Sequence, residues 1–234
     1  MGQKEGACLI CGEPIVYYET SREMNCEICG KSFASNASCT QGHFVCDQCH
    51  SQQGIAAMME QCLTFQGKNP LVLLQSMMEH PYIHMHGPEH HILVGAALLT
   101  AYRNCGGEVD LEQALKEMIK RGKKVPGGIC GFWGCCGAAV SSGIFVSIVT
   151  GSTPLSKEPW GLSNEMTSRS LKAISGLGGP RCCKRNSFTT IRTAVAFVKE
   201  HFQISMELPK KILCDFSHDN HQCIGKRCPY HKSA

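Results

Sequence analysis

The sequence predicts a mainly α-helical protein in which a small metal-binding module precedes a helical domain. The first reason is a run of Cys and His residues before residue 50, at spacings typical of zinc ligands. The second is that apolar residues recur every three or four positions from Ser51 onward, which is the period of an amphipathic helix. We therefore expect a zinc-ribbon or treble-clef-like module over residues 1–50. A helical domain that binds a metal or cluster and ends in a Cys-rich tail should cover 51–234.

The N-terminal module offers four ligand pairs. Two residues between cysteines let both sulfurs reach one ion while backbone amides donate to them, which favours tetrahedral zinc. One or two ions fit, and either sequential or cross-braced pairing is compatible with the spacing; His50 could replace His43. The expected metal ligands are Cys8, Cys11, Cys26, Cys29, Cys39, His43, Cys46 and Cys49.

The helical domain is expected to contain seven helices, at about 55–63, 71–78, 88–102, 110–121, 131–149, 163–175 and 187–202. Pro88 suits a first helical turn, Asp110 a helix cap and Gly122 a helix end. Weak alternation over 204–216 predicts a short strand pair. The uncharged stretch 129–150 is long enough to cross a bilayer, but its glycines, serines and cysteines favour a buried helix.

Composition limits the function classes. The chain has 17 cysteines among 234 residues and opens without an apolar segment, so metal ligation in the cytoplasm is expected rather than a secreted disulfide framework. The odd number of cysteines also argues against complete internal pairing. A net charge of +4 is too small to indicate nucleic-acid binding. We expect neither a nucleic-acid partner nor a membrane.

Five histidines and a carboxylate lie between His80 and His91. Glu89, His90 and His91 fall in the first turn of a predicted helix, where free amides and the positive end of the helix dipole favour an anion. This pattern predicts a substrate pocket with catalytic side chains. The alternative is a polar loop that merely caps the helix.

The remaining cysteines lie in glycine- and arginine-rich turns and in the tail. Cysteines near helix N-termini and cations have lowered pKa values, so Cys130, Cys135, Cys182 and Cys183 are expected to serve as nucleophiles or cluster ligands. Arg181 and Arg185 flank the last two. The tail residues Cys214, Cys223 and Cys228, followed by His231, either close their own zinc or cluster site or supply ligands to the central group.

Three ordered segments resemble iron–sulfur L-serine dehydratases and L-cysteine desulfidases: Gly87-Pro88, Cys130 to the Gly-Ala-Ala run at 137–139, and Gly179-Pro-x-Cys182-x2-Arg185-Asn186. That resemblance implies a [4Fe–4S] cluster on three cysteines, with one iron open to substrate. Cys130 or Cys135 would match the first ligand and Cys182 the third. The sequence departs from the pattern because no cysteine stands at the middle position, and because Glu-His-His replaces the Ser-Ser-His run.

The whole chain also resembles an uncharacterised prokaryotic Cys/His-rich family that is often labelled methyltransferase-like. A Rossmann methyltransferase would need a Gly-x-Gly-x-x-Gly turn after a strand, and the sequence has none. The residues therefore give no support to that label.

These patterns predict an iron–sulfur-dependent enzyme, lyase- or desulfidase-like, that acts on a small hydroxy or thiol substrate. His90 or His91 would move the proton, beside Glu89, and Arg181 or Arg185 would hold a substrate carboxylate. The alternatives are a zinc-only interaction protein or a maturation factor that delivers sulfur or metal, and a methyltransferase-associated protein. The zinc module could also bind a protein partner.

Overall fold

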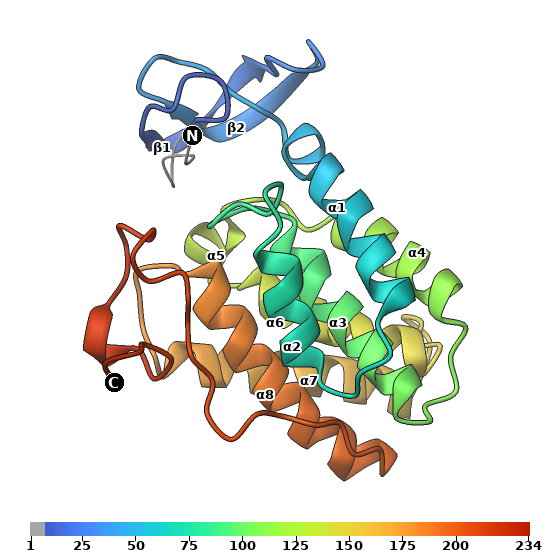
Figure 1. The fold of residues 1–234 in the computed structure, drawn as a ribbon. Coiled ribbons are helices and arrows are strands. Elements are labelled where there is room, and N and C mark those ends of the chain that lie inside the picture. Colours follow the sequence, from blue (N-terminus) through green and yellow to red (C-terminus); the bar gives the residue numbers. More distant parts are fainter. Residues whose placement is uncertain (1–7) are drawn as a thin grey trace.

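The computed structural model describes residues 8–234. A two-stranded hairpin stands at one end of the molecule, and a long helix runs from it into a body of packed helices (Figure 1). The elements are β1 (Ile15–Asn25), β2 (Ser32–Cys39), α1 (Asp47–Thr64), α2 (Pro70–Met78), α3 (His90–Asn104), α4 (Leu111–Gly122), α5 (Ile129–Phe132), α6 (Gly137–Val149), α7 (Glu158–Ser175), α8 (Cys183–Phe202) and the short 3-10 helix η1 (Gly225–Arg227). The prediction of a mainly helical chain with a small N-terminal metal module is thus consistent with the architecture.

The hairpin has almost no apolar interior. Strand β1 pairs antiparallel with β2, from Ile15 opposite Cys39 to Asn25 opposite Ser32, with an irregularity between Tyr17 and Arg22. In the two strands only Ser38 and Cys39 are buried. A two-stranded sheet of this kind is marginal in water, so residues 8–46 need another source of stability.

Helix α3 forms the centre of the helical body. Its residues from His90 to Tyr102 are all buried, and it contacts α1, α2, α4, α6 and α8. Close packing is possible because Gly95 has no side chain: a Cβ atom there would lie 2.3 Å from Sδ of Met118 in α4 and 3.0 Å from the carbonyl oxygen of Ser141 in α6. A helix hydrophobic on all faces is expected at such a position.

Most predicted helix boundaries lie close to the observed ones. Asp110 caps α4 by accepting from the amide of Gln113 at 3.1 Å, and Asn69 caps α2 through the amides of Leu71 and Val72. The helix predicted over 131–149 is interrupted: α5 ends at Phe132, and Gly134 takes a positive φ of 64° before α6 begins. Glycine is the residue that adopts this conformation without strain.

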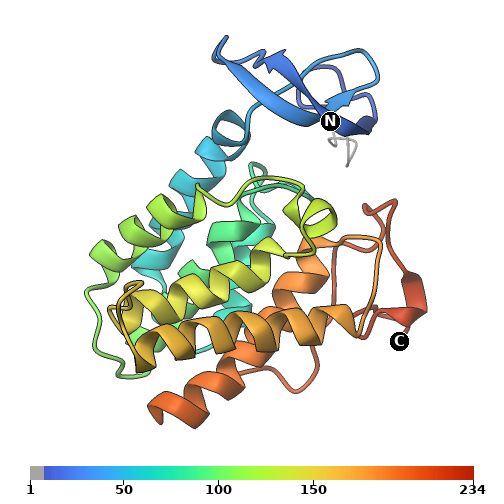
Figure 2. The same ribbon diagram turned by 180° about the vertical axis from the view of Figure 1, so that it is seen from behind.

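The strand pair predicted over 204–216 is wrong. That segment is extended but forms no strand ladder; the amide of Glu207 donates to the carbonyl of Lys68 and that of Cys214 to the carbonyl of Tyr230. Its polar groups are satisfied by the helical body and by the chain end, so weak alternation did not indicate a sheet. Seen from behind, the tail lies along one side of α8 (Figure 2).

Candidate metal centres and a buried Glu-His cluster

The first candidate metal centre is built at one end of the hairpin. Cys8 and Cys11 lie in a turn before β1, which Gly12 completes at a φ of 77°. Cys39 ends β2, and His43 follows in the next turn. The Sγ atoms of Cys11 and Cys39 are 3.7 Å apart, and Nδ1 of His43 lies 3.2 Å from Sγ of Cys11. All four ligand atoms lie within 4.8 Å of one another.

The second centre lies between the strands and α1. Cys26 and Cys29 occupy the turn between β1 and β2, with Gly30 at a φ of 68°. Cys46 and Cys49 lie at the start of α1, and the Sγ atoms of Cys29 and Cys46 are 3.9 Å apart. The four sulfurs again lie within 4.8 Å of one another.

The two groups are interleaved along the chain. The first uses residues 8, 11, 39 and 43, and the second uses 26, 29, 46 and 49, so the arrangement is cross-braced. His50 belongs to neither group. Two thiolates on one tetrahedral zinc ion are about 3.8 Å apart, because each Zn–S bond is about 2.3 Å. Both groups have the donor set and spacing of a zinc site, and could hold a metal ion such as zinc.

Backbone amides favour the thiolate form of one cysteine in each group. Burial opposes ionisation of Cys26, but amides including that of Cys46, 3.3 Å from Sγ, outweigh it and lower the pKa to about 6. Burial likewise opposes ionisation of Cys39, whereas the amides of Gln41 and His43 bring its pKa down to about 7. Such donors are typical of metal-binding turns because thiolate is the ligating form.

A buried cluster of acidic and imidazole side chains lies beside the second centre. The Glu89 side chain is fully buried; Oε1 accepts from the amide of His84 at 3.0 Å. Nδ1 of His50 lies 3.4 Å from Oε2, and Nδ1 of His90 lies 3.6 Å from Oε1. We refer to His50, His84, Glu89 and His90 as the Glu89 cluster. The start of α3 therefore carries a buried carboxylate of the protein itself, bound by a loop amide and close to two imidazoles.

Burial governs the charges in this cluster. It disfavours ionisation of Glu89, but the imidazoles of His50 and His90 more than compensate and hold its pKa at about 2. Burial lowers the pKa of His90 well below its usual range and lowers those of His84 and His91. Four nearby buried atoms have no hydrogen-bond partner: Nδ1 of His50, Nδ1 of His86, Oε2 of Glu89 and Nε2 of His90.

The three other predicted catalytic residues, His91, Arg181 and Arg185, have structural contacts. The Nδ1–H group of His91 donates to the carbonyl oxygen of Val125, 2.9 Å away, and its ring packs against Gly137. Arg185 is buried and donates to the carbonyls of Gly178 and Pro180, each at 2.8 Å. Arg181 stacks over the ring of Tyr17, 5.3 Å from its centroid, and so joins the helical body to the hairpin.

The expectation of lowered thiol pKa values in the helical domain is wrong. Burial raises the pKa of Cys130, Cys135 and Cys182, and raises that of Cys183 to about 12 although the Gly87 amide and Arg181 oppose it. The cost of burying a thiolate outweighs the nearby cations. A raised pKa disfavours the thiolate, which is the form that an activated cysteine nucleophile takes.

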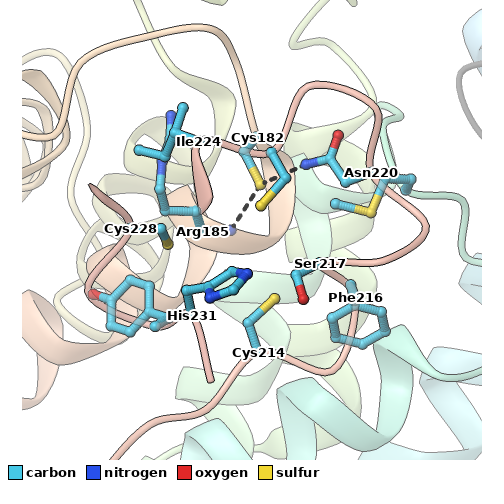
Figure 3. Close-up of a pocket in the computed structure, with 12 residues that line it drawn as sticks. Cys182, Arg185, Cys214, Phe216, Ser217, Asn220, Ile224, Cys228 and His231 are labelled. Carbon is cyan, nitrogen blue, oxygen red and sulfur yellow. Dashed lines mark hydrogen bonds between the residues drawn. The ribbon is translucent and has the colours of Figure 1, made fainter. Parts of the chain in front are cut away.

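One predicted cysteine joins the tail. Cys182, Cys214, Cys223 and Cys228 border a single enclosed cavity, with Arg185, Asn220 and His231 also in its wall (Figure 3). Sγ of Cys182 accepts from the amide of Arg185 at 3.4 Å and from Nδ2 of Asn220 at 3.5 Å. Cys130, Cys135 and Cys183 do not line this cavity. Of the two possibilities for the tail, the structure favours its folding back onto a central cysteine.

Sequence patterns gave no indication of several of these contacts. The burial of Lys184, which donates to the carbonyl of His84 at 3.0 Å, has no signal in a Cys-Cys-Lys-Arg run. The position of Asn220 beside Cys182 depends on a loop 38 residues away. In the sequence, His50 was notable only as a possible zinc ligand. Its contact with Glu89 depends on how α1 packs against α3.

A cross-braced Cys/His module on an α-helical body, with further cysteines around a cavity, defines a candidate metalloprotein. The chain belongs to a family of unknown function, DUF5714, whose model matches residues 58–231. The match contains the four cavity cysteines but begins after the eight residues of the two N-terminal centres. No curated protein and no solved structure matches the chain, so the dehydratase and methyltransferase resemblances gain no support from them.

Among residues 8–234, none of the helices combines the length and the hydropathy that a bilayer crossing requires. The uncharged stretch over 129–150 instead forms α5 and α6, and much of α6 packs against α3 and α7.

Proposed function

We propose that this protein is a zinc-organised metalloprotein whose helical domain carries a separate reactive centre. The observation that supports the zinc part best is the convergence of eight Cys and His side chains into two groups. Thiolate and imidazole ligands at these spacings suit zinc better than magnesium or calcium, which prefer oxygen ligands. Zinc binding would supply the stability that the exposed hairpin lacks.

The module would then have two roles. It positions the start of α1, because Asp47 accepts from the amide of Gly127 at 2.7 Å and His50 lies against Glu89. Its hairpin also borders a face suited to a protein partner: Phe132 of α5, which contacts Tyr17, and Trp133 are half or more exposed. Exposed aromatic side chains are enriched at protein interfaces.

For the helical domain we propose an enzyme that acts on a small hydroxy or thiol substrate and holds an iron–sulfur cluster through its cysteines. The support for acid–base chemistry is the Glu89 cluster, since buried polar atoms without partners are costly and are often retained for function. His50 is 20% exposed and so links the buried carboxylate to solvent. His50 is better placed than His90 or His91 to move a proton, because Nδ1 of His90 is bound to the carbonyl of Gly87 and Nδ1 of His91 to that of Val125.

A second candidate function is a zinc-only interaction or delivery factor, in which the cysteines pass metal or sulfur to a partner. The exposure of Cys11 and Cys29, each within a candidate metal centre, favours transfer to another protein. A site built for transfer needs an accessible ligand, since exchange begins at an exposed sulfur.

Metal analysis of anaerobically purified chain tests the proposal. We expect about two zinc ions per chain, released by chelators only as the module unfolds. A zinc content that survives the paired substitution Cys26→Ser and Cys46→Ser unchanged would overturn the zinc assignment. Iron and sulfide in the same sample would rule out the zinc-only factor, whereas zinc alone would favour it over the enzyme.

A further inference from the structure

We propose that Cys182, Cys214, Cys223 and Cys228 ligate one [4Fe–4S] cluster, with a cysteine sulfur on each of its four irons. The inference rests on the proposed metalloprotein function and identifies which of its cysteines bind the cluster. The four residues come from two places: Cys182 caps the start of α8, and the other three lie in the tail that crosses over it. All four line one small cavity, and Figure 3 labels Cys182, Cys214 and Cys228 around it.

The spacing of these sulfurs differs from that of the two N-terminal centres. There, sulfurs of one group are as close as 3.7 and 3.9 Å, which suits two bonds to a single ion. Among the described residues, the cavity cysteines form no such group: no three of their sulfurs lie within 4.8 Å of one another. The cysteines of a cubane cluster need not come that close to one another, because each thiolate binds a different iron.

Hydrogen-bond donors surround the sulfurs as they do in cluster sites. Cys182 Sγ accepts from the Arg185 amide and from the Asn220 side chain, and Cys223 Sγ accepts from the amide of Gly225 at 3.4 Å. Donors of this kind stabilise the negative charge of a cluster and tune its potential. They are not needed by neutral thiols in an apolar core.

A buried cation also faces the cavity. The Arg185 side chain lines it, is 3% exposed, and has an Nε atom with no hydrogen-bond partner. A cluster bound to four thiolates carries net negative charge, which a buried guanidinium beside it would offset. The backbone amide of Arg185 also donates a hydrogen bond to Sγ of Cys182.

The tail is anchored so that its cysteines stay in place. Tyr230 is 3% exposed; its hydroxyl lies 3.0 Å from that of Thr189 in α8, and its ring packs edge-on against Phe188. Its carbonyl accepts from the amide of Cys214 at 2.7 Å. Between residues 203 and 234 the only helical turn is η1, so a cluster would supply the cross-links that regular structure does not.

His231 lines the same cavity and is the competing ligand. Its Nδ1 accepts from the amide of Ser233 at 3.2 Å, which leaves Nε2 as the one nitrogen available to iron. The cavity measures about 10 Å³, about the room of one water, so cluster binding requires the side chains around it to move apart. We assign the four positions to sulfur because four cysteines already line the cavity.

Four cysteine ligands close the cluster. No iron is left with an open position for a substrate oxygen or sulfur, which is the feature that Lewis-acid lyase chemistry requires. This site is therefore suited to carrying one electron or to fixing the tail. The resemblance to three-cysteine dehydratases does not extend to it.

The test uses the full chain purified without oxygen, with iron, sulfide and zinc measured together. We expect about four irons and four sulfides per chain beside the zinc, and a paramagnetic signal after dithionite reduction that added L-serine or L-cysteine does not alter. Cys214→Ser, Cys223→Ser and Cys228→Ser should each lose most of the iron, while Cys130→Ser, Cys105→Ser and His231→Ala keep it.

Several outcomes overturn the inference. Zinc without iron in the wild-type chain would refute the cluster and leave the two-zinc proposal standing, whereas absence of both metals would refute both. Loss of iron in Cys130→Ser or His231→Ala, with helical content retained, would show a different ligand set. If one tail variant fails to fold, the half-buried Cys223 provides the variant least dependent on packing. Retention of full iron there would also refute the assignment.

Discussion

The imidazole of His50 lies 3.4 Å from the carboxylate of Glu89, measured from Nδ1 to Oε2. His50 directly follows Cys49, a member of the second metal centre, whereas Glu89 precedes the central helix α3 and is fully buried. This contact, together with the bond from the Gly127 amide to Asp47, joins the metal module to the helical body. The second candidate centre and the Glu89 cluster are thus adjacent, joined through Cys49 and His50.

We expect Glu89→Gln to destabilise the fold by about 1–3 kcal/mol, because a buried charged acceptor that interacts with an amide and two imidazoles becomes neutral. Urea unfolding measures the change. The matched control is Glu112→Gln, which removes an exposed helical pair with Lys116 and should cost less than about 0.5 kcal/mol. Equal effects of the two substitutions would show that burial of Glu89 contributes nothing to its role.

Zinc removal should unfold the hairpin and the first turn of α1 but leave the central helices folded. The two strands bury only Ser38 and Cys39, whereas α3 is buried from His90 to Tyr102. Hydrogen exchange followed by mass spectrometry, with and without a chelator, measures this region by region. Protection that persists over residues 15–39 after the metal has been removed would contradict the account.

Stability should fall as pH drops from about 6.5 towards 4. Burial lowers the pKa of His86 from 6.5 to about 4 and lowers those of His84, His90 and His91. The unfolded chain therefore binds more protons than the folded chain in this window, so acid favours unfolding. His86→Gln should flatten the pH dependence of unfolding measured with the chelator present throughout, and an unchanged slope would show that His86 does not contribute.

Gly95→Ala should destabilise the helical body by about 1–3 kcal/mol, since an added methyl group collides with Met118 and the Ser141 carbonyl. Thermal unfolding measures the loss. Gly131→Ala is the control, because no atom lies within 4 Å of a Cβ atom there. If the two variants melt alike, close packing of α3 against α4 and α6 is not what requires glycine at position 95.

The helices were predictable because their signals are local. Asn69, Asp110 and the apolar periodicity specify helix starts and buried faces within a few residues. The break before α6 was missed because the glycines and cysteines between Phe132 and Gly137 fit either a helix or a turn. The strand pair over 204–216 failed because the tail's partners lie elsewhere in the chain, at Lys68 and Tyr230.

The residues that could bind a metal were predictable from the sequence, but which of them share one site was not. Short Cys spacing marks pairs that can share an ion, yet whether Cys8 and Cys11 combine with Cys26 or with Cys39 depends on the register of the hairpin. The grouping of Cys182 with the tail depends on how residues 203–234 cross α8. Burial raises the pKa values of Cys130, Cys135, Cys182 and Cys183. The Gly and Arg residues beside them in the sequence did not indicate that burial.

The central claim is that eight ligands form two interleaved zinc centres, and cobalt substitution of Cys8→Ala/Cys11→Ala tests it most directly. In the cross-braced arrangement the remaining centre has four sulfurs, so its cobalt spectrum should show strong thiolate charge transfer and no imidazole coordination. Sequential pairing would instead leave Cys39, His43, Cys46 and Cys49 as the intact centre. A cobalt spectrum with a bound imidazole in this variant would contradict the account.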